Sequence, residues 1–286
     1  MKKQSSYTDL IGARELNALL HDPSCRIVDC RFELADPARG RALYRAGHIH
    51  GAVFADLDKD LAGTVGPQSG RHPLPDVEAF RQMLCAWGIA NDSQVVAYDQ
   101  GGGASASRFW WMLRWLGHER VAVLDGGLGA WEAFGGEIDA DELPVARSEY
   151  IARPNDTMVA TTQEIEAKLA AGEPCLLVDA RDERRFRGEV EPIDPVAGRI
   201  PGSVNLPFQK NLDASGLWRS SEELREIWRS HWQGGDAELP ITLCGSGVTA
   251  CHLILAAKRA GLPLPRLYVG SWSEWIRDPN RPIARG

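Results

Sequence analysis

Ile27-Val28-Asp29-Cys30-Arg31 reappears in the second half of the chain as Leu177-Val178-Asp179-Ala180-Arg181. Three further blocks recur in the same order. Residues 46–53 match residues 197–204, residues 95–99 match residues 240–244, and residues 126–131 match residues 270–275. Matching blocks that keep one order indicate an internal duplication, so we predict that the chain consists of two copies of one domain.

Each copy alternates between short apolar runs and helical segments. The apolar runs are typical of buried strands and cover residues 25–29, 95–98, 121–124, 175–178, 241–243 and 267–269. Two helix starts fit a capping box, in which a hydroxyl and a carboxyl satisfy exposed amides: Thr161 with Glu164, and Ser220 with Glu223. Because strands that alternate with helices require crossover connections, each copy is predicted to be an α/β domain with a mostly parallel sheet flanked by helices.

The stretch between the copies is rich in Asp, Glu, Pro and Arg and lacks apolar periodicity. We therefore predict an N-terminal domain over residues 7–137, a linker over residues 138–157 and a C-terminal domain over residues 158–286. In parallel sheets, ligands gather at the carboxyl ends of the strands. This rule directs attention to the loops that follow Tyr98 and Leu243.

The overall composition excludes several classes of protein. Of the 286 residues, 44% are hydrophobic and 25% are charged, a balance typical of globular proteins. The 32 basic and 39 acidic side chains give a net charge of −7. Since no basic run is present to neutralise phosphates, we expect no nucleic-acid partner. Six cysteines are too few for a disulfide scaffold and indicate reduced thiols in a cytoplasmic protein.

No membrane segment is expected. The lysines near Met1 are not followed by an apolar stretch, which argues against a secretory signal. The longest uncharged stretch near the C-terminus, residues 239–257, is interrupted by Pro240, Gly245 and Gly247. It is better explained as a strand, a loop and a buried helix than as a membrane span.

The loop after the 241–243 run carries the strongest chemical signal. Cys244-Gly245-Ser246-Gly247-Val248-Thr249 precedes a helical run over residues 250–257. Its two glycines allow a tight turn whose backbone N–H groups point inward, and a helix N-terminus favours a sulfur in its anionic form. On the residues alone, Cys244 is either an activated nucleophile or a small buried hydrophobic side chain, because most free cysteines are the latter.

The sequence resembles the two-domain sulfurtransferases of the rhodanese family over nearly its whole length. Both Asp-x-Arg motifs, both glycine-bounded Ile motifs and both Trp-ended blocks carry the resemblance, and the Cys244 loop is its most specific element. In that family, thiosulfate-preferring enzymes have two cationic residues directly after the cysteine, whereas 3-mercaptopyruvate-preferring enzymes have Gly-Ser, as at Gly245 and Ser246. The resemblance therefore implies two tandem rhodanese-like domains and closest similarity to the 3-mercaptopyruvate-preferring branch.

By this resemblance, Cys244 attacks the sulfur of 3-mercaptopyruvate, a small-molecule sulfur donor, and pyruvate leaves while Cys244 holds a persulfide. An acceptor thiol such as thioredoxin or a small thiol, or cyanide in vitro, then takes the sulfur, so the kinetics should be ping-pong. The substrate-binding loop residues are implied to be Gly245, Gly247, Val248 and Thr249. Asp99 stands at the cysteine position of the first copy, and since a carboxylate cannot carry sulfane sulfur, that copy is expected to be catalytically silent.

Arginines receive a role from the same resemblance. Arg185, followed by Phe186, matches a position that binds the substrate carboxylate, which an arginine can grip with two parallel hydrogen bonds. A second such arginine is expected where this chain has Asp194, and Arg199 is a candidate replacement.

A proton-transfer group is also implied. Asp58, His72 and Ser246 match a Ser-His-Asp arrangement in which the serine hydroxyl assists proton transfer to or from the substrate. A histidine in a loop is more often structural than catalytic, and both roles remain open for His72. Trp272 and Trp275 follow the last predicted strand and are expected to wall the site.

No cofactor and no metal are expected. His48 with His50, or Cys251 with His252, invite a metal site, but no CxxC motif or second cluster completes the ligand set of a structural zinc site. The glycine clusters at residues 101–103 and 126–129 do not form the G-x-G-x-x-G pattern of a dinucleotide-binding loop.

Other functions compete with the main hypothesis. A thiosulfate:cyanide sulfurtransferase would use the same Cys244, and the uncharged loop argues against it as the main activity. A phosphatase on this fold needs an arginine that closes a Cys-x5-Arg loop, and Ala250 stands at that position. A carrier module that accepts persulfide from a partner would also use Cys244, but it would load once, whereas an enzyme releases pyruvate repeatedly.

Overall fold

The computed structural model describes residues 6–232 and 239–286, and its contacts divide the chain into two compact units. The N-terminal unit comprises residues 6–63, 75–155 and 216–218. The C-terminal unit comprises residues 64–74 and 156–215 together with the described residues from 219 to 286. Each unit therefore includes a short segment from the other half of the chain.

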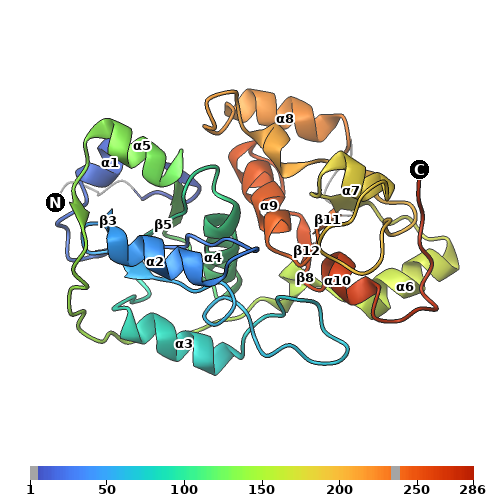
Figure 1. Ribbon diagram of the computed structural model, residues 1–286, viewed down its shortest axis with the longest axis horizontal. Helices are drawn as coiled ribbons and strands as arrows, with labels where there is room; N and C mark the ends of the chain where they lie inside the picture. The colour runs from blue at the N-terminus through green and yellow to red at the C-terminus, as the bar shows by residue number, and fades with distance from the viewer. Residues whose placement is uncertain (1–5, 233–238) are drawn as a thin grey trace. The chain divides into compact units, whose positions relative to one another are not determined.

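A five-stranded parallel sheet forms the centre of the N-terminal unit (Figure 1). The strands lie in the order β1 (Leu10–Ile11), β6 (Val121–Leu124), β5 (Gln94–Tyr98), β2 (Cys25–Asp29) and β4 (Val53–Phe54). A separate antiparallel pair consists of β3 (His48–Ile49) and β7 (Ile138–Asp139). The helices are α1 (Ala13–Asn17), α2 (Ala38–Ala46), α3 (Val77–Ala86), α4 (Ala104–Trp115) and α5 (Gly127–Phe134).

The C-terminal unit repeats this topology. Its parallel strands lie in the order β8 (Val159–Ala160), β12 (Arg266–Tyr268), β11 (Ile241–Leu243), β9 (Leu177–Asp179) and β10 (Val204–Asn205). Its α-helices are α6 (Thr162–Ala171), α7 (Glu183–Arg187), α8 (Ser221–Arg229), α9 (Thr249–Arg259) and α10 (Ser271–Trp275), and its 3-10 helices are η1 (Asp156–Met158) and η2 (Phe208–Asn211). Equivalent strands of the two units fall in the same order, which confirms the predicted duplicated α/β fold.

The predicted strands all form. The runs 25–29, 121–124 and 241–243 have the predicted bounds, and the other three are displaced by one or two residues. Ser220 and Glu223 form the complete capping box at the start of α8. At α6 only one half of the predicted capping box forms. The Thr161 hydroxyl accepts the Glu164 amide at 3.2 Å, but the Glu164 carboxylate pairs with Arg266 at 2.8 Å instead of returning to the cap.

All helices are of ordinary length. The longest that the structure describes are α4 with 12 residues and α9 with 11. Among the described residues, no helix has both the length and the apolar character that crossing a membrane would require. Residues 239–257 contain a strand, a loop and a helix, as the glycines and the proline predicted.

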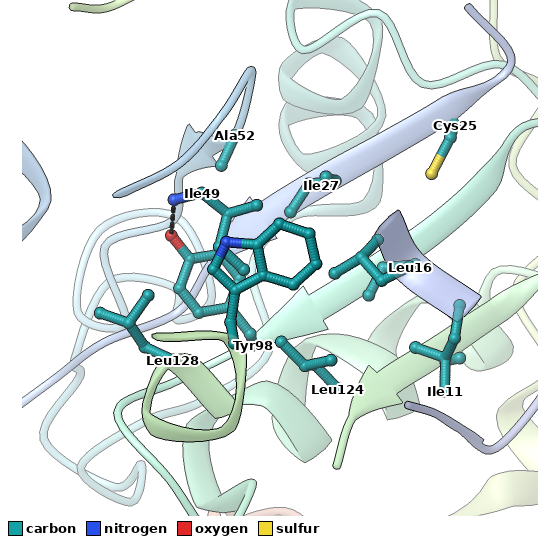
Figure 2. Close-up of a cluster of buried hydrophobic side chains, with 12 residues drawn as sticks. Ile11, Leu16, Cys25, Ile27, Ile49, Ala52, Tyr98, Leu124 and Leu128 are labelled. Carbon is teal, nitrogen blue, oxygen red and sulfur yellow. Dashed lines mark hydrogen bonds between the residues drawn. The ribbon is translucent and has the colours of Figure 1, made fainter. Parts of the chain in front are cut away.

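One face of the N-terminal sheet packs against α1 and α5. Ile27 and Tyr98 point from the strands into a buried cluster with Leu16 and Leu128 from those helices (Figure 2). The Tyr98 hydroxyl also accepts the Ile49 amide at 3.2 Å, the bond dashed in Figure 2. Because side chains alternate across a strand, the opposite face of the same strands is available to α4.

The repeated Asp-x-Arg motif has the same structural task in both units. At the end of β2, Arg31 donates Nε and Nη2 to Asp29 at 2.9 and 2.6 Å, and Nη2 also reaches the Gly47 carbonyl at 2.7 Å. In the C-terminal unit, Arg181 makes the equivalent bonds to Asp179 at 3.0 and 2.8 Å and to the Gly198 carbonyl at 2.8 Å. The motif therefore ties a strand end to the glycine of the next repeated block, which is a reason for both blocks to recur together.

Residues 138–155, which were predicted to form most of the linker, are bound to the N-terminal unit. Backbone amides of the segment donate to carbonyls at the ends of α3 and α4. The bonds are Ser148 to Cys85 at 2.9 Å, Arg153 to Leu116 at 3.0 Å and Asn155 to Trp115 at 2.9 Å. Apart from the short strand β7 at its start, the segment satisfies the ends of helices instead of forming a regular element, which agrees with its polar sequence.

Candidate active site

Cys244 lies directly after β11, the central strand of the C-terminal sheet, and is only 2% exposed. Gly247 adopts φ +76°, and its amide donates to Cys244 Sγ at 3.2 Å. A Cβ on Gly247 would lie 2.5 Å from the Val269 carbonyl oxygen, so both the conformation and the space require glycine. Because α9 begins at Thr249, the unpaired amides and the positive dipole end of this helix adjoin the loop. The sulfur therefore lies where backbone groups favour negative charge.

The first turn of α10 anchors the Cys244 loop. Trp272 and Ser273 donate their amides to the carbonyls of Cys244 and Gly245 at 3.0 and 2.9 Å. Ser271 Oγ accepts the Cys244 amide at 3.0 Å and donates to the Tyr268 carbonyl at 2.9 Å. Ser271 is fully buried and has φ +52°, a conformation that residues with a Cβ rarely adopt. The sequence analysis missed Ser271 as a residue that positions the nucleophile.

A signal for Ser271 is present in the sequence repeat. Gly127 stands at the equivalent position of the N-terminal unit and has φ +57°. The amides that follow it, those of Leu128 and Gly129, donate to the carbonyls of Asp99 and Gln100 at 2.9 and 3.4 Å. Because the two units share this geometry, the alignment of Ser271 with Gly127 is a sequence signal that Ser271 adopts a backbone conformation that favours glycine.

In the N-terminal unit a carboxylate occupies the cradle that holds sulfur in the C-terminal unit. The Asp99 carboxylate accepts the amides of Gly101 at 3.1 Å, Gly103 at 3.0 Å, Ser105 at 3.0 Å and Ala106 at 3.3 Å. Burial raises the pKa of Asp99 to about 6, although these amides favour the ionised form. No thiol stands at this position.

Ser246 and His72, two of the three predicted proton-transfer residues, lie together in the C-terminal unit. Ser246 Oγ is 2.8 Å from His72 Nδ1, and the two residues are 6% and 4% exposed. His72 belongs to the segment 64–74, which comes from the first half of the chain. Asp58, the third predicted member, lies in the N-terminal unit, where its amide donates to Asp56 at 3.1 Å.

Arg185, on α7, lies beside the Cys244 loop and is surrounded by carboxylates. Its Nε and Nη2 donate to Glu191 at 3.1 and 2.7 Å, and Nη2 also reaches Asp194 at 3.3 Å. The other Asp194 oxygen accepts Arg71 Nη1 at 2.5 Å. Asp194, which stands where a second arginine was expected, thus bridges two arginines.

Behind the loop, Arg181 is a second buried cation. Burial by itself would lower the pKa of Arg181, but the Asp179 carboxylate, with Glu191 and Cys244, raises it overall. Its guanidinium lies 4.9 Å from the ring centre of Trp272. The site therefore keeps a permanent positive charge near the nucleophile.

Four other candidate residues have structural roles. Trp272 and Trp275 are fully buried in the core of the C-terminal unit, so the prediction that they wall the site was wrong. Arg199 lies 4.8 Å above the Phe186 ring and donates to the Gly286 carbonyl at 2.7 Å. Cys251 is a buried thiol that donates to the Gly247 carbonyl at 3.3 Å.

One group of described side chains has the spacing of metal ligands. His50 Nδ1 lies 2.5 Å from Asp139 Oδ2 and 3.3 Å from Glu137 Oε1, in the N-terminal unit. The contact with Asp139 is also an ordinary hydrogen bond between a histidine and a carboxylate. The remaining candidates have other partners, since His48 Nδ1 contacts the Tyr44 carbonyl at 2.8 Å and His252 Nδ1 contacts Asn211 at 3.1 Å.

Known proteins are similar to this chain in both sequence and fold. A model of the rhodanese-like domain matches residues 12–134 and again residues 161–278. The chain is 46% identical over 284 residues to a protein of Pseudomonas aeruginosa named probable 3-mercaptopyruvate sulfurtransferase, covering 98% of this chain and 99% of that protein. It is 34% identical over 298 residues to the thiosulfate sulfurtransferase of Rattus norvegicus, covering 100% and 98%. The solved structure of 3-mercaptopyruvate sulfurtransferase from Leishmania major is similar at a TM-score of 0.82 and 33% identity, covering 96% of this chain and 75% of that one.

Proposed function

The chain belongs to the rhodanese-like family as a two-domain sulfurtransferase, and from this premise we propose that it transfers the sulfur of 3-mercaptopyruvate through a persulfide on Cys244. The observation that carries the proposal is the environment of Cys244 Sγ. The sulfur accepts the Gly247 amide at 3.2 Å at the start of α9. Ser246, two residues after the nucleophile, contacts His72 at 2.8 Å.

In the first step, the Cys244 thiolate attacks the thiol sulfur of 3-mercaptopyruvate. A sulfur–sulfur bond forms while the carbon–sulfur bond of the donor breaks, and the electron pair of that bond moves into the enolate of pyruvate. Ser246 Oγ, paired with His72, passes the donor's thiol proton to the enolate carbon. The products are pyruvate and a Cys244 persulfide anion, so no external proton or oxidant is needed.

In the second step, an acceptor thiol attacks the outer sulfur of the persulfide. The bond between the two sulfurs breaks, Cys244 leaves as a thiolate, and the acceptor carries the new persulfide. Thioredoxin or a small thiol would serve in the cell, and cyanide serves in vitro. A cytoplasmic location fits this chemistry, because no two cysteines of the described residues form a disulfide and the acceptor must stay reduced.

The same geometry supports the proposed choice of substrate-binding residues. Arg185 would bind the donor carboxylate beside Gly245, while the turn at Gly247 and the start of α9 at Val248 and Thr249 would hold the transferred sulfur. The N-terminal domain, residues 7–137, would be silent because Asp99 replaces the nucleophile.

The test compares kcat/KM for 3-mercaptopyruvate and thiosulfate with cyanide as the shared acceptor, in the natural enzyme, Cys244→Ser and Cys175→Ser. We expect a large preference for 3-mercaptopyruvate that Cys244→Ser abolishes and Cys175→Ser retains, because Cys175 lies outside the loop. A preference for thiosulfate would refute the proposal that 3-mercaptopyruvate is the donor. Loading of one sulfur without repeated release of pyruvate would indicate a carrier.

A further inference from the structure

Two histidines and two carboxylates gather in the N-terminal unit, away from the residues assigned to sulfur transfer. This group, the His50 cluster, consists of His21, His50, Glu137 and Asp139. Next to the antiparallel pair of β3 and β7, the His50 amide donates to the Glu137 carbonyl at 3.2 Å, so these two residues face each other. Asp139 lies two residues beyond Glu137 and therefore projects from the same face of the pair. The strand pairing thus places one histidine beside two carboxylates.

The side-chain atoms of these three residues have nearly the separations of ligands around one small ion. His50 Nδ1 lies 3.3 Å from Glu137 Oε1 and 2.5 Å from Asp139 Oδ2, and one ligand atom of each residue lies within 4.8 Å of the other two. Around a tetrahedral ion with bonds of about 2.0–2.2 Å, neighbouring ligand atoms are about 3.3–3.6 Å apart. Glu137 already meets this spacing, and Asp139 reaches it when its carboxylate moves away from His50 by about 1 Å.

His21, in the turn after α1, supplies a fourth ligand. Its Nε2 lies 3.9 Å from Glu137 Oε2, and its ring centre lies 5.4 Å from that of His50 in an edge-on contact. The His21 side chain is 71% exposed, so it can rotate toward an ion without a loss of packing. Both histidines line one cavity of about 320 Å³, which leaves room beside them for an ion and its remaining water.

The charges of the His50 cluster also favour a cation. Within the described part of the chain, neither Glu137 nor Asp139 forms an ion pair with a lysine or an arginine, and their charged partners are the two histidines. The buried carboxylates Asp29 and Asp179, by contrast, each bind an arginine. A set of two imidazole nitrogens and two carboxylate oxygens suits Zn²⁺ and similar transition-metal ions better than Mg²⁺ or Ca²⁺, which prefer oxygen ligands.

We propose that the His50 cluster binds one Zn²⁺ or a chemically similar transition-metal ion, which fastens the β3–β7 pair to the turn after α1. The site does not depend on the proposed sulfur transfer, because none of its residues belongs to the Cys244 loop and all lie in the N-terminal unit. It departs from the expectation of no metal, which rested on the lack of a second cluster in the sequence. The fold supplies Asp139 to His50 from 89 positions away. The alternative explanation of this contact is a hydrogen bond that needs no ion.

The experiment titrates the chelator-treated full chain with Zn²⁺ by calorimetry and compares the unchanged cluster with His50→Asn, Asp139→Asn and His231→Asn. Each chain also carries Cys244→Ser, because the thiolate of the nucleophile is itself a zinc ligand. Asparagine has its amide nitrogen on Cγ, as histidine has Nδ1, so His50→Asn keeps a hydrogen-bond donor for Asp139 while it removes the metal ligand. His231 is the matched control, since its Nδ1 contacts Ser230 Oγ at 2.8 Å rather than a carboxylate.

We expect one Zn²⁺ per chain in the unchanged cluster and in His231→Asn. His50→Asn and Asp139→Asn should bind Zn²⁺ at least about 10- to 100-fold more weakly, because the loss of a ligand costs at least as much as the loss of a group that orients one. Mg²⁺ should not compete. Co²⁺ should give visible absorption without the sulfur-to-metal charge-transfer band of thiolate ligands. On addition of Zn²⁺, peptides that cover residues 44–54 and 132–142 should gain protection from hydrogen exchange.

Three results would overturn the site. The first is no binding of Zn²⁺ by the unchanged cluster, which would leave the contact of His50 with Asp139 as a hydrogen bond alone. The second is equal affinity in His50→Asn and Asp139→Asn, and the third is a sulfur-to-cobalt band, which would place the ion on another cysteine. Melting temperatures without metal identify loss of fold, and Asp139→Asn keeps the test valid if His50→Asn unfolds.

Discussion

Replacement of Ser271 tests whether a strained serine holds the catalytic loop. Ser271→Ala leaves the buried Cys244 amide and the Tyr268 carbonyl without their hydroxyl partner. An orphaned buried polar group costs about 1–3 kcal/mol. Alanine also retains the cost of a Cβ at φ +52°, about 1–2 kcal/mol, which the natural serine carries as well. We therefore expect Ser271→Ala to lower the free energy of unfolding by about 2 kcal/mol.

Ser271→Gly loses the same hydrogen bonds but releases the strain. It should be more stable than Ser271→Ala by about 1 kcal/mol, although glycine is ordinarily less stable than alanine inside a helix by a similar amount. We therefore expect the glycine variant to be more stable than the alanine variant, which is the reverse of the ordinary order in a helix. Both variants should lower kcat, because the Cys244 amide no longer has a fixed acceptor and the sulfur loses its position.

Hydrogen exchange of peptides from residues 241–259 measures this stability in the C-terminal unit itself, where a whole-chain melting curve would mix both units. Gly127→Ser is the matched contrast in the N-terminal unit. Its φ is +57°, but a Cβ there would lie 2.5 Å from the Asp99 carbonyl oxygen, so we expect a larger loss than for Ser271→Ala. If Ser271→Gly is less stable than Ser271→Ala, or if both variants match the natural protein within about 0.5 kcal/mol, the argument from strain and loop anchoring is refuted.

Three further predictions concern charged and titratable groups. The pKa of Asp99 is raised to about 6 from 3.8, so the folded state binds this proton more tightly than the unfolded chain does. The group thus contributes about 3 kcal/mol of stability below pH 4 that is lost as pH rises through 6. Urea titrations should show Asp99→Asn more destabilising at pH 4 than at pH 7, and a constant difference would contradict the shift. His72→Asn and Ser246→Ala should each lower kcat for 3-mercaptopyruvate by about 100-fold, with little further loss in the double variant, because they act as one pair; additive losses would show separate roles. Arg181→Met leaves Asp179 buried without its cation and should cost about 3–5 kcal/mol in unfolding experiments, as should Arg31→Met in the N-terminal unit. If either substitution leaves the free energy of unfolding almost unchanged, water solvates the aspartate carboxylate in place of the arginine.

The local sequence determined the fold class, the duplication and the position of Cys244. Strands were predictable because apolar runs and the residues that end them lie next to one another in the chain. The Asp-x-Arg repeat was also visible, since each aspartate binds an arginine two residues away. The structure adds that this arginine also donates a hydrogen bond to the carbonyl of a glycine in the next repeated block.

Only some of the residues that form the site could be predicted from the sequence. Cys244, Ser246 and Arg185 lie in or near recognisable motifs, whereas Trp272 and Trp275 were assigned to the site wall because their pattern does not reveal which face of a helix is buried. Ser271 escaped notice because its φ value is a property of the backbone rather than of the residue type.

Only the tertiary structure decided that residues 64–74 belong to the C-terminal unit. This brings His72 to Ser246 and Arg71 to Gly245 across long separations in the chain. It also turns Asp194 from an apparent loss of charge into a bridge between two arginines. Periodicity and capping report on neighbours along the chain, but a site is made by groups that packing and hydrogen bonding bring together from distant segments. For that reason the sequence identified the nucleophile, and the fold identified what surrounds it.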